Sequence, residues 1–149
     1  MAALDVSMTR EEIEAYLLEQ RTVRLATADA SGVPHVVPLW FVWHEGAMYL
    51  NSTLGNVTVR NMLAGGPATG VVDDGEAYDQ LRGVTLTGEV ERLGDTVPED
   101  VQRAWSEKYL SGGELPYRRW RNRSWFRLSP TSTASWDFRK IPQGRARSR

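Results

Sequence analysis

Hydrophobic and polar residues alternate along much of the chain, and this pattern predicts a mainly antiparallel β protein. Over 82–93, Val84, Leu86 and Val90 occupy alternate positions among polar neighbours, the period of a half-buried strand. Further strands, rich in β-branched and aromatic residues, are predicted over 23–27, 36–43, 47–52, 68–73, 125–128 and 133–136. Pro38 interrupts one of these strands, which predicts an edge position or a bulge there.

A 3.6-residue hydrophobic period marks the helical segments. Helices are predicted over 9–20, 56–63 and 96–110, with a short helical turn over 116–121. Thr9 and Glu12 have the spacing of a capping box at the start of the first helix. Thr96 and Glu99 have the same spacing and predict the start of the third. The expected architecture is therefore six or seven antiparallel strands with helices around them.

The length of 149 residues suits one domain, which we expect to span 1–140 and to be followed by a disordered basic tail over 141–149. The chain has no cysteine, its start lacks the apolar core of a signal peptide, and its longest apolar run, 36–43, is too short to span a membrane. These features predict a soluble cytoplasmic protein.

Charge is divided unevenly along the sequence. Residues 1–116 carry eight lysines and arginines against 18 aspartates and glutamates, whereas residues 117–149 carry ten against one. One interpretation is that the basic part lies against acidic surface of the same or a partner subunit. The other is a binding site for phosphate or carboxylate.

Most self-contained enzyme chemistries lack their residues in this sequence. His35 and His44 are the only histidines, and neither belongs to a metal-binding or Ser-His-Asp pattern. Walker and Rossmann glycine motifs are also missing. We therefore expect no metal site, and we expect any reactivity to come from a bound cofactor.

The segment 51–61 combines hydroxyl and amide side chains with the start of a helix and with Arg60. Backbone N–H groups at a helix start and a nearby arginine favour an anion such as phosphate. The alternative is that Ser52, Thr53 and Asn56 only cap the helix and that Arg60 is solvated.

Four segments in this order resemble the pyridoxamine-phosphate-oxidase-like split barrels, specifically the actinobacterial flavin/deazaflavin oxidoreductases. They are GVPHVVPLWF (32–41), VRNM (59–62), GEV (88–90) and SWDFRK (135–140). The resemblance spans about 9–140. It implies a split β-barrel of the FMN-binding type and a homodimer with two cofactor sites, each shared between subunits. The implied cofactor is coenzyme F420, a deazaflavin, or alternatively FMN.

The resemblance also implies which residues hold the cofactor. The flavin-like ring would lie against Val37, Pro38, Leu39 and Trp40. The tail and phosphate would be held by Ser52, Thr53, Asn56, Thr58, Arg60 and Asn61, with Trp120 and Arg121 completing the site. Many deazaflavin-binding relatives carry a lysine where this chain has Thr58. Either Arg60 and the arginines of 118–123 compensate, or the cofactor is bound weakly, differently or not at all.

The segment 117–125 interleaves arginines with aromatic residues. Such a pattern also occurs in nucleic-acid binding, but the sequence pI of about 6.1 argues against it. Packing of Trp120 and Trp125 in a core or interface is a further alternative. We expect no nucleic-acid or membrane partner.

Taken together, the sequence predicts a deazaflavin-dependent reductase that transfers a hydride to an unsaturated small-molecule substrate. The alternatives are an FMN-dependent oxidoreductase and a non-catalytic flavin- or deazaflavin-binding protein. No catalytic residue is identified. A proton could come from Tyr78, from an arginine-held water or from solvent.

Overall fold

Six antiparallel strands close into a barrel in the order β1-β2-β3-β6-β5-β4. The computed structural model describes residues 3–117, 119 and 121–142. The strands are β1 (Thr22–Ala28), β2 (Pro34–His44), β3 (Ala47–Thr53), β4 (Ala68–Asp74), β5 (Arg82–Gly94) and β6 (Arg123–Asp137). The helices are α1 (Arg10–Glu19), α2 (Val57–Leu63) and α3 (Glu99–Tyr109), with short 3-10 helices η1 (Tyr78–Gln80) and η2 (Phe138–Lys140). The predicted antiparallel barrel with flanking helices is confirmed, with six strands.

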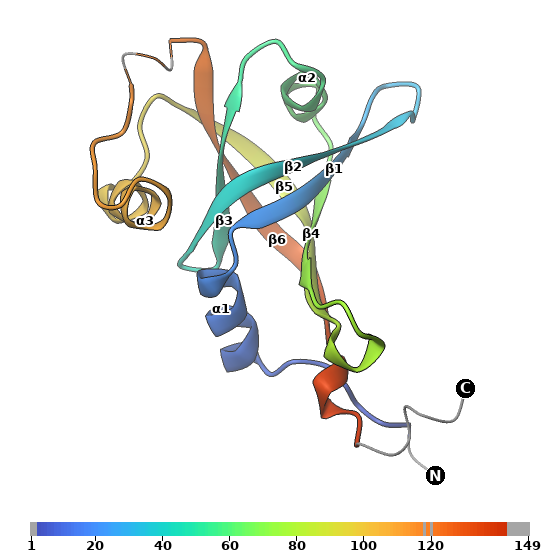
Figure 1. Ribbon diagram of the computed structural model, residues 1–149. Helices are drawn as coiled ribbons and strands as arrows, with labels where there is room; N and C mark the ends of the chain where they lie inside the picture. The colour runs from blue at the N-terminus through green and yellow to red at the C-terminus, as the bar shows by residue number, and fades with distance from the viewer. Residues whose placement is uncertain (1–2, 118, 120, 143–149) are drawn as a thin grey trace.

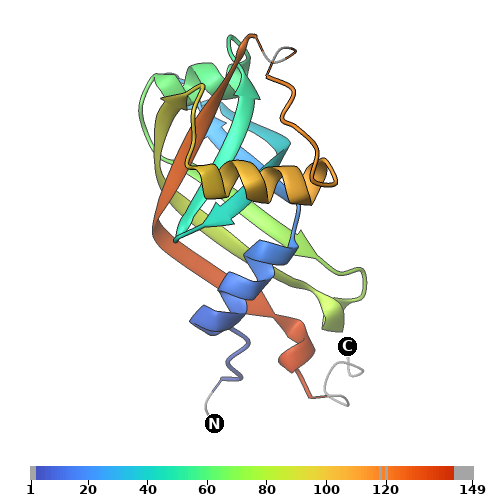
Figure 2. The same cartoon turned by 90° about the vertical axis from the view of Figure 1, so that its left-hand side faces the viewer.

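The three α-helices occupy different sides of the barrel. In Figure 1, α1 lies at the lower end and α2 at the upper end, while α3 packs outside the wall. Figure 2 shows α3 crossing the outer face of the barrel. The predicted capping box of α1 is confirmed, because Thr9 Oγ1 accepts from Glu12 N at 3.2 Å and Glu12 Oε2 accepts from Thr9 N at 2.9 Å.

Two hydrophobic clusters follow from the alternation of side chains along each strand. On β3, Met48 and Leu50 belong to the cluster inside the barrel. The intervening Tyr49 belongs to a second cluster with Trp105 of α3 and Trp125 of β6. The outer wall of the barrel is therefore buried where α3 covers it, and this second cluster fixes α3 in place.

The first half of β2 has a neighbour on one side only. Residues from Pro34 to Trp40 pair with β1, whereas pairing with β3 begins at Phe41. The predicted edge position of Pro38 is confirmed. The register shifts of the barrel lie instead between β5 and β6, at Thr87/Gly88 and Arg92/Gly94.

Three local predictions are wrong. The third helix has Pro98 as its N-cap with no side-chain hydrogen bond, so the Thr96–Glu99 capping box does not form. The two last predicted strands are one strand, β6, because pairing with β5 continues past Pro130 through a register shift. The helical turn predicted over 116–121 is wrong in extent, because the described residues of that segment form a hydrogen-bonded turn in which Arg119 N donates to the Pro116 backbone oxygen at 2.8 Å. Most of the predicted basic tail, 143–149, lies outside the described residues.

Candidate functional site

The predicted ring-binding residues lie on the half-paired part of β2. Pro38 and Trp40 are exposed, whereas Val37 and Leu39 are half-buried. The ring of Trp40 stacks on Tyr109 of α3, with centroids 4.4 Å apart and an angle of 9° between the planes. Trp40 nevertheless keeps 51% of its surface exposed. The structure therefore holds a flat aromatic side chain rigidly while leaving much of it open to solvent.

At the start of α2, several predicted tail-binding side chains are used by the fold itself. Asn56 Oδ1 accepts from Val59 N at 2.8 Å and Asn56 Nδ2 donates to Ser52 Oγ at 3.2 Å. Asn61 Nδ2 donates to Thr27 Oγ1 at 3.1 Å, and both residues are buried. These contacts agree with the helix-capping alternative for Ser52 and Asn56.

The remaining three residues of that set differ in exposure. Thr58 is only 2% exposed, so the side chain of a lysine at this position would start from a buried part of the backbone. Thr53 and Arg60 are exposed. Among the described residues, no carboxylate oxygen lies within 4.0 Å of the Arg60 guanidinium. Arg60 and Thr53 are therefore the side chains of this region open to an anion.

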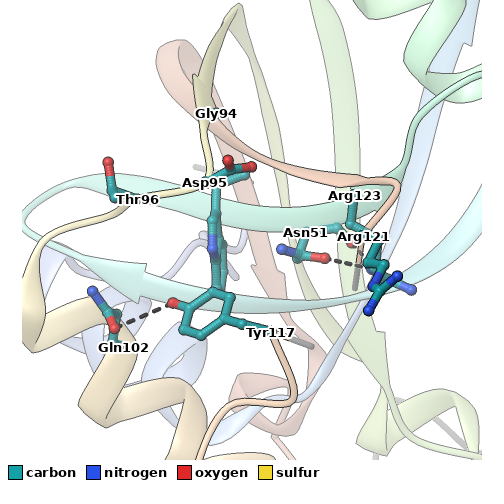
Figure 3. A pocket seen from close by; sticks show the side chains of 9 residues that line it. Asn51, Gly94, Asp95, Thr96, Gln102, Tyr117, Arg121 and Arg123 are labelled. Atoms are coloured by element: carbon teal, nitrogen blue, oxygen red, sulfur yellow. Dashed lines mark hydrogen bonds between the residues drawn. The ribbon is translucent and has the colours of Figure 1, made fainter. Parts of the chain in front are cut away.

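A pocket of about 410 Å³ lies on the side of β3 that faces α3. It is lined by Asn51, Gly94, Asp95, Thr96, Gln102, Tyr117, Arg121, Arg123 and Trp125. Figure 3 shows Asn51, Arg121 and Arg123 together on one side, with Gln102 and Tyr117 on the other. Of the predicted cofactor residues, the structure brings Arg121 into this pocket.

Hydrogen bonds hold the charged side of the pocket. Arg123 Nε donates to Asn51 Oδ1 at 2.6 Å, and its Nη2 donates to the backbone oxygen of Asn51 at 3.2 Å. Burial lowers the pKa of the Arg123 guanidinium, but an arginine starts so high that it stays charged at neutral pH. On the far side, Tyr117 Oη donates to Gln102 Oε1 at 3.2 Å. The pocket therefore presents a positioned cation.

The pocket and the start of α2 lie on either side of the end of β3. Thr53 pairs with Arg123 in the strand register, and Leu54 N donates to the backbone oxygen of Asn122 at 2.8 Å. The chain then passes through Gly55 into α2. Residues that the sequence assigns to tail binding and the arginines before β6 are thus brought to one end of the barrel.

Aromatic contacts connect this end with Trp40. The ring centroids of Trp40 and Trp105 lie 6.3 Å apart, and those of Trp105 and Trp125 lie 5.0 Å apart, both edge-on. Trp125 lines the pocket. One aromatic cluster therefore has an exposed ring at one end and an arginine-lined pocket at the other.

Sequence reasoning missed most residues of the pocket. Arg123 and Tyr117 belong to the basic aromatic segment that was identified, so that segment was the available signal. Asp95 and Gln102 carry no recognisable motif and reach the pocket only through the packing of α3. Trp120 lies outside the described residues, so its predicted role stays a prediction.

Tyr78, one predicted proton source, is not part of this region. It lies in η1, with its ring 5.1 Å from that of Phe138 in η2. Figure 1 shows that end of the barrel opposite α2.

Two features are absent from the described residues. No group of three or more histidine, aspartate or glutamate side chains is arranged to hold a metal ion. Within the same part of the chain, every helix is too short or too polar to cross a membrane.

A closed six-stranded antiparallel barrel with a half-paired second strand and flanking helices defines a split-barrel protein. Comparison with protein families narrows this class. The family described as pyridoxamine 5'-phosphate oxidase matches residues 9–137, and the chain belongs to that family. A search of curated proteins finds no match.

Solved structures share the fold. A conserved hypothetical protein from Mycobacterium tuberculosis is 27% identical, with a TM-score of 0.80 over 95% of this chain and 92% of that one. An FAD-binding protein from Mesorhizobium loti is 24% identical, with a TM-score of 0.67 over 87% of this chain and 94% of that one. A heme storage protein from Vibrio cholerae is 18% identical, with a TM-score of 0.66 over 83% of this chain and 92% of that one.

Proposed function

We propose that this protein binds a flavin-type cofactor and acts as a deazaflavin-dependent reductase, which transfers a hydride from reduced coenzyme F420 to an unsaturated organic substrate. The observation that carries the proposal is the aromatic cluster with the exposed Trp40 ring at one end and the pocket of Arg121 and Arg123 at the other. A flavin-type cofactor combines a flat ring with an anionic tail. Family membership and the FAD-binding structural relative support the same cofactor class.

The residues present fit such a group. The Trp40 side chain offers a flat apolar surface, held against Tyr109 so that little side-chain freedom is lost on binding. Arg60 and Thr53 are open to a phosphate, and Arg121 lines the pocket, where it could contact further acidic groups of the tail. When bound, the cofactor supplies the hydride. The protein binds it, orients it and excludes water.

Thr58 keeps two alternatives open. Its side chain is buried in place of the lysine of many deazaflavin-binding relatives, so Arg60 would be the principal cation of α2. An FMN-dependent oxidoreductase needs fewer contacts with anionic groups of the cofactor, because the phosphate is the anionic group of FMN. A non-catalytic carrier is the other alternative, since the structural relatives include a heme storage protein.

A homodimer, which the family resemblance implies, is part of the proposal. Trp105 of α3 and Trp125 of β6 are buried within the chain, so neither contributes exposed apolar surface. Three exposed apolar side chains, Val33, Val36 and Trp40, lie on or beside β2, and each is more than half exposed. Large apolar side chains grouped on one strand favour a protein contact.

Titration of the purified protein with FMN and with the deazaflavin tests the proposal. Arg60→Ala should weaken binding of both cofactors by roughly ten- to a hundredfold, the loss of one charge-assisted hydrogen bond. Arg121→Ala should weaken the deazaflavin more than FMN, because only the deazaflavin has the longer acidic tail. Arg103→Ala, on the exposed face of α3 and paired with Asp100, is the matched control.

Activity and assembly are measured separately. Oxidation of the reduced deazaflavin by an enone distinguishes a reductase from a carrier, and sedimentation reports the dimer. If neither Arg60→Ala nor Arg121→Ala changes either dissociation constant while both proteins stay folded, the cofactor site is elsewhere.

A further inference from the structure

Lysine is rare in this chain. The sequence has 2 lysines among its 18 basic residues, and all the others are arginine. Lys140 is ion-paired, because its Nζ lies 2.7 Å from Glu12 Oε2 and donates to the backbone oxygen of Ser7 at 2.6 Å. Arginine stays charged in proteins, whereas a lysine that loses solvent also loses its proton readily. The surroundings of the other lysine, Lys108, are therefore informative.

Lys108 lies in α3 against the barrel wall. Its Nζ is 4.4 Å from the centre of the Phe41 ring and 3.4 Å from the Phe41 backbone oxygen. Among the described residues, no carboxylate oxygen lies within 4.0 Å of this amine. The two lysines thus differ: Lys140 has an acidic partner, and Lys108 packs on an aromatic ring.

A pocket of about 300 Å³ opens beside Lys108. It is lined by Leu18 of α1, Val42 and Trp43 of β2, and Ala104, Glu107 and Lys108 of α3. Most of these side chains are apolar, so the pocket suits an apolar molecule. Glu107 is the acidic side chain of this set.

Burial of Lys108 favours the neutral form of its amine. Burial lowers the pKa of Lys108 to about 8, and the positive charge of Arg21 acts in the same direction. Tyr109, the other titratable group beside it, stays neutral because burial raises its pKa to about 12. At pH 7.5 roughly a quarter of Lys108 would be unprotonated, against about one part in a thousand of an ordinary lysine.

We propose that Lys108 is a carbonyl-binding site, at which the amine forms an imine with an apolar aldehyde held in the pocket between α1, β2 and α3. The lysine nitrogen attacks the carbonyl carbon, a carbon–nitrogen double bond forms, and the carbonyl oxygen leaves as water with the two protons of the amine. No oxidant or reductant is needed. The site does not depend on the proposed cofactor function, because the pocket shares no lining residue with the arginine-lined pocket.

The test traps the imine on the intact protein. Benzaldehyde with cyanoborohydride at pH 7.5, followed by peptide mass analysis, should label Lys108 about tenfold faster than Lys140, since lower basicity offsets part of the gain in neutral amine. The N-terminal amine is distinguished by its own peptide. Formaldehyde, which has no apolar body to bind, should discriminate less between the two lysines.

Two variants complete the experiment. Lys108→Arg should abolish this label while circular dichroism and cofactor binding stay unchanged. Leu18→Glu replaces an exposed wall of the pocket by a carboxylate and should slow the labelling of Lys108 severalfold. Equal labelling of the two lysines, or equal discrimination by formaldehyde and benzaldehyde, would overturn the proposal.

Discussion

The hydroxyl of Tyr109 makes polar contacts between α3 and the barrel. It accepts from Phe41 N at 3.0 Å, and it lies 2.6 Å from the Phe41 backbone oxygen and 2.7 Å from that of Arg21, to one of which it donates. Phe41 is the first residue of β2 in the register with β3. The Tyr109 hydroxyl therefore satisfies backbone groups at the point where pairing of β2 with β3 begins.

Tyr109→Phe removes this hydroxyl and leaves the ring that stacks on Trp40. The Phe41 N–H would lose its partner in a region covered by α3, which costs about 1–3 kcal/mol. For a chain of this size each kcal/mol lowers Tm by roughly 2–4 °C. We expect the variant to be less stable by this amount and to keep its fold.

The pH dependence gives a second readout. Burial raises the pKa of Tyr109 to about 12, above the value near 10 of an unfolded tyrosine. The folded state therefore binds the Tyr109 proton more tightly than the unfolded state. The resulting contribution to folding stability is present below about pH 10 and is lost as the pH rises towards 12. The stability difference between wild type and Tyr109→Phe should narrow above pH 10.

Urea unfolding at pH 7 and pH 10.5 measures both effects. Tyr117→Phe is the control, because Tyr117 is 41% exposed and its hydroxyl donates to a side chain, Gln102. We expect this control to change stability by less than about 0.5 kcal/mol. A Tyr109→Phe variant as stable as the control at pH 7 would refute the stabilising role of the Tyr109 hydroxyl as the partner of the Phe41 N–H.

Two further substitutions test the barrel and its lower end. Gly88→Ala would place a Cβ against the backbone oxygen of Ser129 at a register shift, so we expect urea unfolding to show a loss of several kcal/mol in stability. The control, Gly112→Ala, has open space around the Cβ but a φ of 80°, so it should cost only about 1 kcal/mol. The hydrogen bonds of Arg139 lower the pKa of the buried Asp137, so Asp137→Asn should destabilise the protein at pH 7 by about 1 kcal/mol. This difference in stability should disappear as the pH falls below about 4, where the Asp137 carboxylate becomes protonated. An equal difference at pH 3 and pH 7 would contradict this prediction.

Elements specified by nearby residues could be predicted from the sequence. The capping box of α1 depends on two residues three positions apart, and both halves form. The same spacing failed at Thr96 because Pro98 takes the N-cap position. The single long strand β6 was not predictable locally, since Pro130 is accommodated by Gly88 of the neighbouring strand.

The candidate site was predicted less completely for a similar reason. Ser52 and Asn61 were identified as polar residues near a helix start, but only the fold shows that their side chains bond to Asn56 and Thr27. The pocket joins Asn51 to Arg123, residues that meet only when β3 and β6 pair. Sequence spacing carries no information on such a meeting.

The position of β6 between β3 and β5 also constrains synthesis of the protein. β3 has no partner on that side until β6 has been made, since Met48 pairs with Leu128. Translation proceeds at about 5–20 residues per second, so the interval from residue 53 to residue 137 lasts roughly 4–17 s. During that time the nascent chain exposes the edge of β3 and the apolar face that includes Leu50. The unfinished chain on the ribosome therefore exposes a strand edge and an apolar surface that the closed barrel covers.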